Sequence, residues 1–210
     1  MKKVFFTLCF FTAFMLCQST THAQIRLGAK GGFTFASQSY KNRNDNFNPG
    51  ILPGITVGGI AEYQLTEKIS FASGLQYMSK GYKAKDEGDK YTLSFSYIQI
   101  PVQAQYHHDQ FFGAFGFYFG KALGGKYKKE SGYEADLDLG KEVSDDFSGS
   151  DFGIVLEGGY AIQPQLRGSL FVNAGMTNLV PGEAQDIYDD IIKNSVFGLA
   201  VTYLFFEKQM

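Results

Sequence analysis

The sequence predicts an all-β protein in which eight antiparallel strands form an up-and-down transmembrane β-barrel. Three observations lead to this prediction: the composition, a regular alternation of short and long connections, and strands that are apolar along one face. The 210 residues include 25 Gly, 21 Phe and 13 Tyr but only 5 Pro. Aromatic and β-branched residues favour strands, whereas proline is depleted in them.

Gly-, Asn- and Asp-rich stretches divide the chain into eight segments of strand character. The connections between these segments alternate, so that "TEK", "HHDQ" and "QPQ" are short and the others are longer. Strands that run up and down therefore place all short turns at one end. Short periplasmic turns and long external loops are typical of outer-membrane barrels. The expected strands are 24–36, 52–65, 68–83, 90–106, 111–124, 150–162, 166–179 and 194–206.

The segment "FFGAFGFYFG" (111–120) shows how the two faces of a strand differ. Successive side chains point to opposite faces, which separates Phe115, Phe117 and Phe119 from Gly116 and Gly120. A soluble barrel would bury the aromatic face, but the other face of these strands lacks the dense Lys and Glu of a soluble exterior. We therefore expect the rings to meet lipid. Phe112 and Tyr118 fall on the inner face and are expected to fill the barrel.

Four tyrosines lie near the short-turn ends of their strands and on the same outer face: Tyr63, Tyr106, Tyr160 and Tyr203. Tyrosine favours the boundary between hydrocarbon and water because its ring is apolar and its hydroxyl stays hydrated. Membrane barrels carry such aromatic girdles at both interfaces. The tyrosines thus predict a girdle on the periplasmic side.

Charged residues on the inner face predict a polar plug that holds the barrel closed. We expect Arg26 to lie opposite Glu62 after the first hairpin closes, because unpaired buried charges cost several kcal/mol. Eight strands leave an interior that side chains fill, which argues against a general porin; a proton or substrate path is the alternative. The expected inner charges are Arg26, Lys30, Glu62, Glu157 and Arg167.

The first 23 residues resemble a secretory signal peptide, with Lys2 and Lys3, an apolar run over 4–16 and a small residue at Ala23. Residues 24–210 then form the barrel domain. Both cysteines lie in the leader, which leaves no disulfide, thiolate metal site or cysteine nucleophile in that domain. A net charge of −2 gives no field that would recruit nucleic acid.

The sequence predicts no catalytic, cofactor-binding or metal site. His107 and His108 are expected to be solvated turn residues, and neighbours in a strand point apart and make a poor metal site. No His–Ser–acid grouping is apparent. The acidic stretch 134–146 lacks the order of an EF-hand loop and is expected to be a solvated, mobile external loop.

Several stretches resemble the PorT-like outer-membrane β-barrel family of Bacteroidota: "GAKGGFTFA", "PGITVGGIAEYQLTEKISFASGLQYMSKG", "YIQIPVQAQYH" and "SVFGLAVTYLFF". The resemblance covers roughly 24–206. It implies a small eight-stranded barrel and carries over no catalytic residues. In many outer-membrane barrels the chain ends on an aromatic residue, whereas here Phe206 is followed by four more residues.

These observations together predict an integral protein of the cell outer membrane without enzymatic activity. Its function is structural, or it binds a partner through loops 37–51 and 126–149. Outer-membrane lipid surrounds it, and the expected partners are lipopolysaccharide or another envelope protein. The residues expected to meet lipopolysaccharide phosphates are Lys126, Lys128 and Lys129, with Lys121 at the barrel rim. The alternatives are a soluble exported lipocalin-like barrel that binds an apolar ligand, and a lipid-modifying barrel enzyme.

Overall fold

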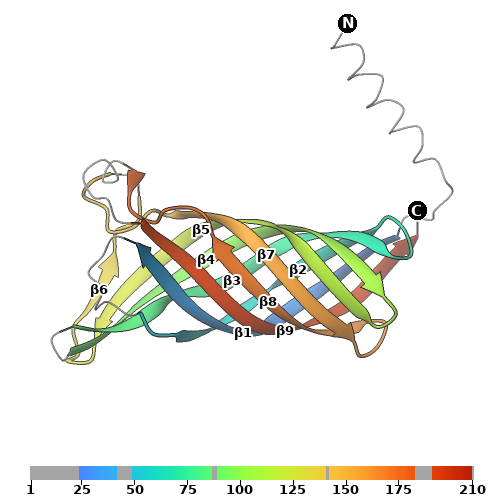
Figure 1. Cartoon of the computed structure of the whole chain (residues 1–210), viewed down its shortest axis with the longest axis horizontal. Coiled ribbons are helices and arrows are strands. Elements are labelled where there is room, and N and C mark those ends of the chain that lie inside the picture. The colour runs from blue at the N-terminus through green and yellow to red at the C-terminus, as the bar shows by residue number, and fades with distance from the viewer. Residues whose placement is uncertain (1–23, 42–48, 87–88, 141, 183–190, 210) are drawn as a thin grey trace, which may run out of the picture.

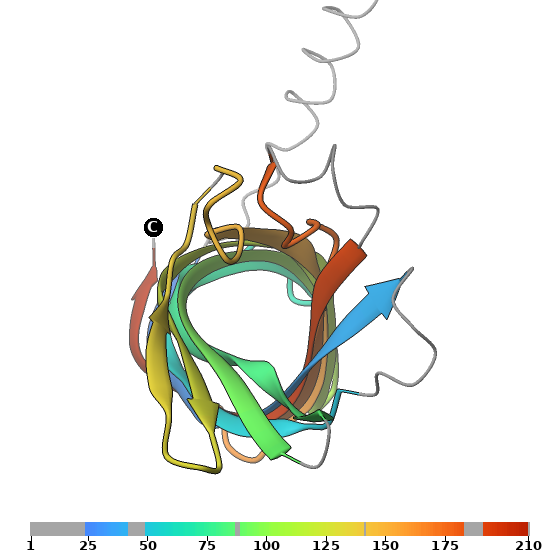
Figure 2. The ribbon, with the colours of Figure 1, turned by 90° about the vertical axis from the view of Figure 1, so that its left-hand side faces the viewer.

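The computed structural model describes residues 24–41, 49–86, 89–140, 142–182 and 191–209. The predicted signal peptide (1–23), with both cysteines, and part of the loop 37–51 lie outside the described residues. Figure 1 shows a single tilted cylinder, which Figure 2 shows end-on as a ring. Among the described residues, no helix is long and apolar enough to cross a membrane.

Eight antiparallel strands form the ring, in the order β4-β3-β2-β1-β9-β8-β7-β5, and pairing of β4 with β5 closes it. This confirms the predicted fold class. A ninth strand, β6, pairs with the outer end of β5 alone. The strands are β1 (Gln24–Lys41), β2 (Leu52–Gln64), β3 (Ile69–Asp86), β4 (Asp89–His108), β5 (Phe111–Lys129), β6 (Glu134–Leu137), β7 (Ser150–Ala161), β8 (Leu166–Gly175) and β9 (Ile191–Gln209).

At the external end, β1, β3, β4, β5 and β9 extend beyond the predicted strands, whereas β8 ends at Gly175, before the predicted end at 179. The β3–β4 ladder runs to the pair Asp86 and Asp89, and the β4–β5 ladder runs to Tyr91 and Lys129. The predicted loop 126–149 therefore begins inside β5 and contains β6, which projects at the left of Figure 1. The polar side chains of this region led to its prediction as a loop. Polar side chains do not prevent backbone pairing, however, and the paired hairpins extend into water.

The outer face of the barrel is apolar, as the alternation predicted. In β5, Phe111, Phe115 and Phe119 keep between 50% and 65% of their surface exposed, whereas Phe112 and Tyr118 keep 9% and 1%. The four girdle tyrosines are also exposed on the outer face. A soluble barrel with an apolar interior is therefore the wrong alternative, because contiguous exposed aromatic surface of this kind needs hydrocarbon as its solvent.

The substitution Phe117→Arg tests the lipid-facing assignment. Phe117 pairs with Val102 on one side and Ile154 on the other, midway along β5. We expect a loss of about 2–4 kcal/mol in the free energy of unfolding, measured by urea titration in lipid vesicles, and about 0–1 kcal/mol for Phe111→Arg at the interface. Equal losses at the two positions would contradict the assignment.

Candidate functional site

The inside of the barrel holds three layers of charged side chains, and the first lies at the periplasmic end. Arg26 lies opposite Glu62 in the β1–β2 register and forms an ion pair with it, as predicted. Arg167 of β8 donates from Nη1 to the other oxygen of Glu62 at 2.6 Å. Its guanidinium lies 5.6 Å from the centre of the Phe112 ring. One carboxylate thus joins three strands across the lumen.

The middle layer centres on Glu157 of β7. Lys30 of β1 donates from Nζ to both carboxylate oxygens, at 2.6 and 2.7 Å. Gln103 of β4 donates to Oε2 at 3.2 Å. Lys30 and Glu157 were both predicted to face inward, and the structure shows that they pair across the lumen between non-adjacent strands.

The external layer pairs Lys80 of β3 with Asp151 of β7 at 2.8 Å, and neither side chain is exposed to solvent. Tyr118 and Asn194 donate to the same carboxylate oxygen, at 3.2 and 2.9 Å. The Lys80 ammonium also lies 4.3 Å from the centre of the Tyr118 ring. Sequence reasoning missed Lys80, although its even number places it on the face of Gln76 and Met78.

Glycines in the wall make room for the rings inside it. A Cβ atom added at Gly153 would lie 2.7 Å from the Tyr118 ring, which is closer than real Cβ contacts. Tyr118 therefore fits because its neighbour on β7 has no side chain. Together with the ion pairs, the inward rings fill the lumen at three levels, in agreement with the interior expected for eight strands. The structure favours the polar plug over a path through the barrel.

The structure brings a Ser–His–acid group together at the periplasmic end, which the sequence did not reveal. His107 belongs to β4 and is mostly buried, so the prediction of a solvated turn residue is wrong for it; His108 on the opposite face is exposed. His107 Nε2 lies 2.8 Å from Ser70 Oγ and 3.6 Å from Glu62 Oε1. The register of β3 and β4 sets this contact, because Ser70 lies opposite Gln105, two residues before His107.

This group lacks the geometry of a catalytic triad. A triad histidine accepts the serine proton on one ring nitrogen and donates to the acid from the other. Here Ser70 and Glu62 both face Nε2, and the Ser70 hydroxyl donates to Gln105 at 3.3 Å. The serine and the acid thus lie at the same ring nitrogen, so Glu62 does not orient the imidazole from its other nitrogen as a triad acid does. We assign the group to the packing of the lumen.

The loop after β5 caps the external mouth. Leu137, Leu139 and Phe147 pack against the buried cluster that includes Tyr82 and Phe95. Phe147 and Phe95 make an edge-to-face contact with ring centres 5.1 Å apart. Most acidic side chains of this stretch are exposed, as expected for a solvated loop. The apolar side chains that alternate with them pack against the barrel, which the sequence analysis did not predict.

The acidic residues of that loop bond to the loop itself. Asp145 accepts from the Glu142 backbone at 2.7 Å, and Asp146 accepts from the Asp138 backbone at 2.9 Å. Within the described ranges, no three His, Cys, Asp or Glu side chains converge in a way that could hold a metal ion. The acidic stretch therefore stabilises turns.

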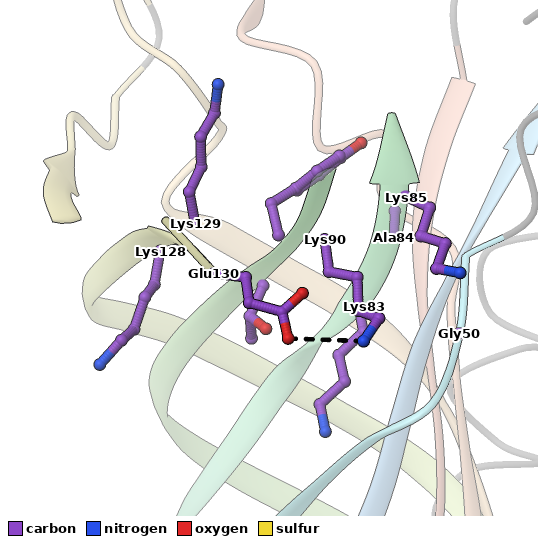
Figure 3. A pocket seen from close by; sticks show the side chains of 10 residues that line it. Gly50, Lys83, Ala84, Lys85, Lys90, Lys128, Lys129 and Glu130 are labelled. Atoms are coloured by element: carbon purple, nitrogen blue, oxygen red, sulfur yellow. Dashed lines mark hydrogen bonds and ion pairs between the residues drawn. The ribbon is translucent and has the colours of Figure 1, made fainter. Parts of the chain in front are cut away.

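A lysine-rich cleft of about 490 Å³ lies at the external rim, where the β3–β4 hairpin meets the end of β5. Figure 3 shows Lys90 turned toward Glu130, with Nζ and the carboxylate 3.4 Å apart, and Lys128 and Lys129 pointing in different directions. Lys126 also binds Glu134 of β6 at 3.2 Å. This contact raises the pKa of the Lys126 ammonium and lowers the pKa of the Glu134 carboxyl.

A barrel with an apolar belt, a filled lumen and an elaborated external end is an integral outer-membrane barrel. A model of the outer membrane protein beta-barrel domain matches residues 17–180. The chain therefore belongs to the outer membrane protein beta-barrel domain family, and its location is the outer membrane. Among curated protein sequences none matches this chain.

Solved structures share the fold at low sequence identity. The chain is similar to Neisserial surface protein A, with 12% identity, coverage of 85% of this chain and 97% of that one, and a TM-score of 0.52. It also matches Ail of Yersinia pestis, with 12% identity, coverage of 88% and 100%, and a TM-score of 0.46. OprG of Pseudomonas aeruginosa matches with 12% identity, coverage of 87% and 95%, and a TM-score of 0.46. At this identity the first likeness shows the fold alone.

Proposed function

We propose that this protein is a closed, non-enzymatic outer-membrane barrel that acts by binding at its external end. The buried ion pairs at three levels of the lumen carry this proposal. Separating them to admit a solute would leave charges buried without partners, at a cost of several kcal/mol for each ion. The interior therefore stabilises the barrel, and the surfaces left for function lie outside it.

The external end supports a binding role because its described residues expose apolar side chains. Tyr133, beyond β5, is 61% exposed, and Val143 in the following turn is 49% exposed. Ile51, from the predicted binding loop 37–51, is 61% exposed. These groups lie outside the apolar belt and face water, where aromatic and aliphatic anchors are typical of protein interfaces. An envelope protein that docks on 37–51 and 126–149 fits them.

We also propose that the barrel is of the PorT-like type of Bacteroidota. The stretch "GAKGGFTFA" forms part of β1 and "YIQIPVQAQYH" forms part of β4, so the residues that carry the resemblance build the wall of the barrel. They support kinship in architecture. The proposal does not include a role in protein secretion.

Photocrosslinking in intact cells tests the binding role. A crosslinking residue at Tyr133 is expected to capture a defined envelope protein, and Val143→Ser is expected to reduce the yield several-fold while the amount of folded barrel stays unchanged. A probe at Ile162, which is 57% exposed next to the short β7–β8 turn, is the matched control. Deleting residues 127–148 would be a poor variant because it removes Leu137 and Phe147 from the cap.

Two results would overturn the proposal. Ion conductance of the purified full-length protein in a planar bilayer would show that the lumen opens. An absence of any specific crosslink from either loop would leave a purely structural role.

A further inference from the structure

A band of hydroxyls and lysines covers the outer face of the barrel just beyond its apolar belt. On β4 the apolar outward residues end at Ile98, and Thr92, Ser94 and Ser96 follow on the same face, while Phe95 and Tyr97 between them are buried. Tyr77 of β3 lies beside them, with its hydroxyl 2.9 Å from Ser96 Oγ.

Lysines flank this hydroxyl band on both neighbouring strands. In register with Thr92 lie Lys83 of β3 and Lys128 of β5; Lys126 lies in register with Ser94, and Lys121 with Ile98. All four lysines are exposed. Among the described residues, neither Lys83 nor Lys121 has a carboxylate within ion-pair distance, whereas Lys126 and Lys128 share Glu134. We call Lys83, Lys121, Lys126, Lys128, Thr92, Ser94 and Ser96 the lysine face.

We propose that the lysine face binds the phosphate groups of lipopolysaccharide in the outer leaflet. The proposal rests on the proposed function, a barrel that acts by binding at its external end, and it names the lipid partner and the strands that hold it. Lysine ammonium groups attract phosphates, and hydroxyls donate hydrogen bonds to their oxygens. Glu130, Glu134 and Asp136 face the same region, and the four lysines of the lysine face outnumber these three acids.

The height of the lysine face favours a tall phosphorylated headgroup over a phospholipid. Six residues separate Ile98 from Thr92 along β4, which is roughly 20 Å of strand and about 14 Å of height at the usual tilt. The headgroup region of one phospholipid leaflet is only about 5–7 Å thick. Lys121, in register with Ile98, lies at the base of this stretch of β4, and Lys83, in register with Thr92, lies at its top. Lys83 can therefore meet a phosphate group only in a lipid whose headgroup rises well above the apolar belt.

The test measures binding of purified lipopolysaccharide to the full-length barrel in detergent, by native mass spectrometry and calorimetry. The variant replaces Lys83 and Lys121 by glutamine. The matched control replaces Lys41 and Lys193 by glutamine, which removes the same charge from the external ends of β1 and β9 on the opposite wall. We expect roughly 10- to 30-fold weaker binding for the first variant and little change for the control.

Three outcomes would overturn this inference: equal losses in the two variants, unchanged binding of lipopolysaccharide stripped of its phosphates, or equally tight binding of phosphatidylglycerol vesicles. Both variants should retain the heat-modifiable gel shift of a folded barrel, because Lys41, Lys83 and Lys121 are exposed and Lys193 is only half-buried. Failure of the proposed function looks different. Release of a deacylated or dephosphorylated lipid would show an enzyme while leaving the lysine face intact, and loss of the Tyr133 crosslink would concern the protein partner alone.

Discussion

The substitution Glu62→Gln is expected to lower the free energy of unfolding by about 3–5 kcal/mol, because it leaves the buried Arg167 and the half-buried Arg26 without a counter-charge. Glu62 is fully buried and holds both Arg26 and Arg167. The glutamine has nearly the same volume, so the loss reports on charge and not on a cavity. Urea titration in lipid vesicles, followed by the shift between folded and unfolded bands on a gel, measures the change.

The matched control is Glu67→Gln in the exposed turn between β2 and β3. It makes the same chemical change at the same end of the barrel, and surface substitutions of this kind usually stay within about 0.5 kcal/mol. The double variant Glu62→Gln with Arg167→Met should recover part of the loss, because it removes one of the two unpaired cations. Equal losses for Glu62→Gln and Glu67→Gln would show that the periplasmic layer does not stabilise the fold.

Asp151→Asn is expected to cost about 3–5 kcal/mol for the same reason at the external layer, since Lys80 is then buried without a counter-charge. The double variant Lys80→Met with Asp151→Asn should recover most of that loss. Replacement of a whole buried pair by apolar or neutral groups is often close to neutral. The asparagine oxygen still accepts from Tyr118, so the double variant leaves that hydroxyl satisfied.

A double-mutant cycle on Lys80 and Asp151 measures their coupling. A buried contact predicts strong non-additivity, whereas side chains that do not meet give losses that add within about 0.3–0.5 kcal/mol. Lys90→Met with Glu130→Gln is the matched control cycle, because this exposed pair lies at the same end of the barrel. Additive losses at Lys80 and Asp151 would mean that the external layer is absent in the membrane.

The sequence predicted the wall of the barrel well because the face to which each side chain of a strand points is a local property. The alternation of Phe115 and Phe117 with Gly116 follows from the two-residue period of any strand. In an up-and-down barrel, the short turn between two neighbouring strands also limits which of their residues can lie opposite one another. That was sufficient to place Arg26 opposite Glu62 and to identify the tyrosine girdle. Polarity misled at the external end, where Lys126 and Lys128 were assigned to a loop although their backbone continues the β5 ladder.

Contacts across the lumen were beyond prediction because they join strands that are not neighbours. Lys80 and Asp151 come from β3 and β7, and their meeting depends on the stagger of the strands when the sheet closes. Glu62, Ser70 and His107 come instead from the consecutive neighbours β2, β3 and β4, and the register of these strands brings them together. By itself the sequence predicted the class of protein, because its strands have one apolar face and the opposite face lacks the dense Lys and Glu of a soluble exterior. Only the tertiary structure decided which charges pair inside the barrel and which lysines share its external face. The reason is that closure of the sheet sets the height of each residue along the barrel axis.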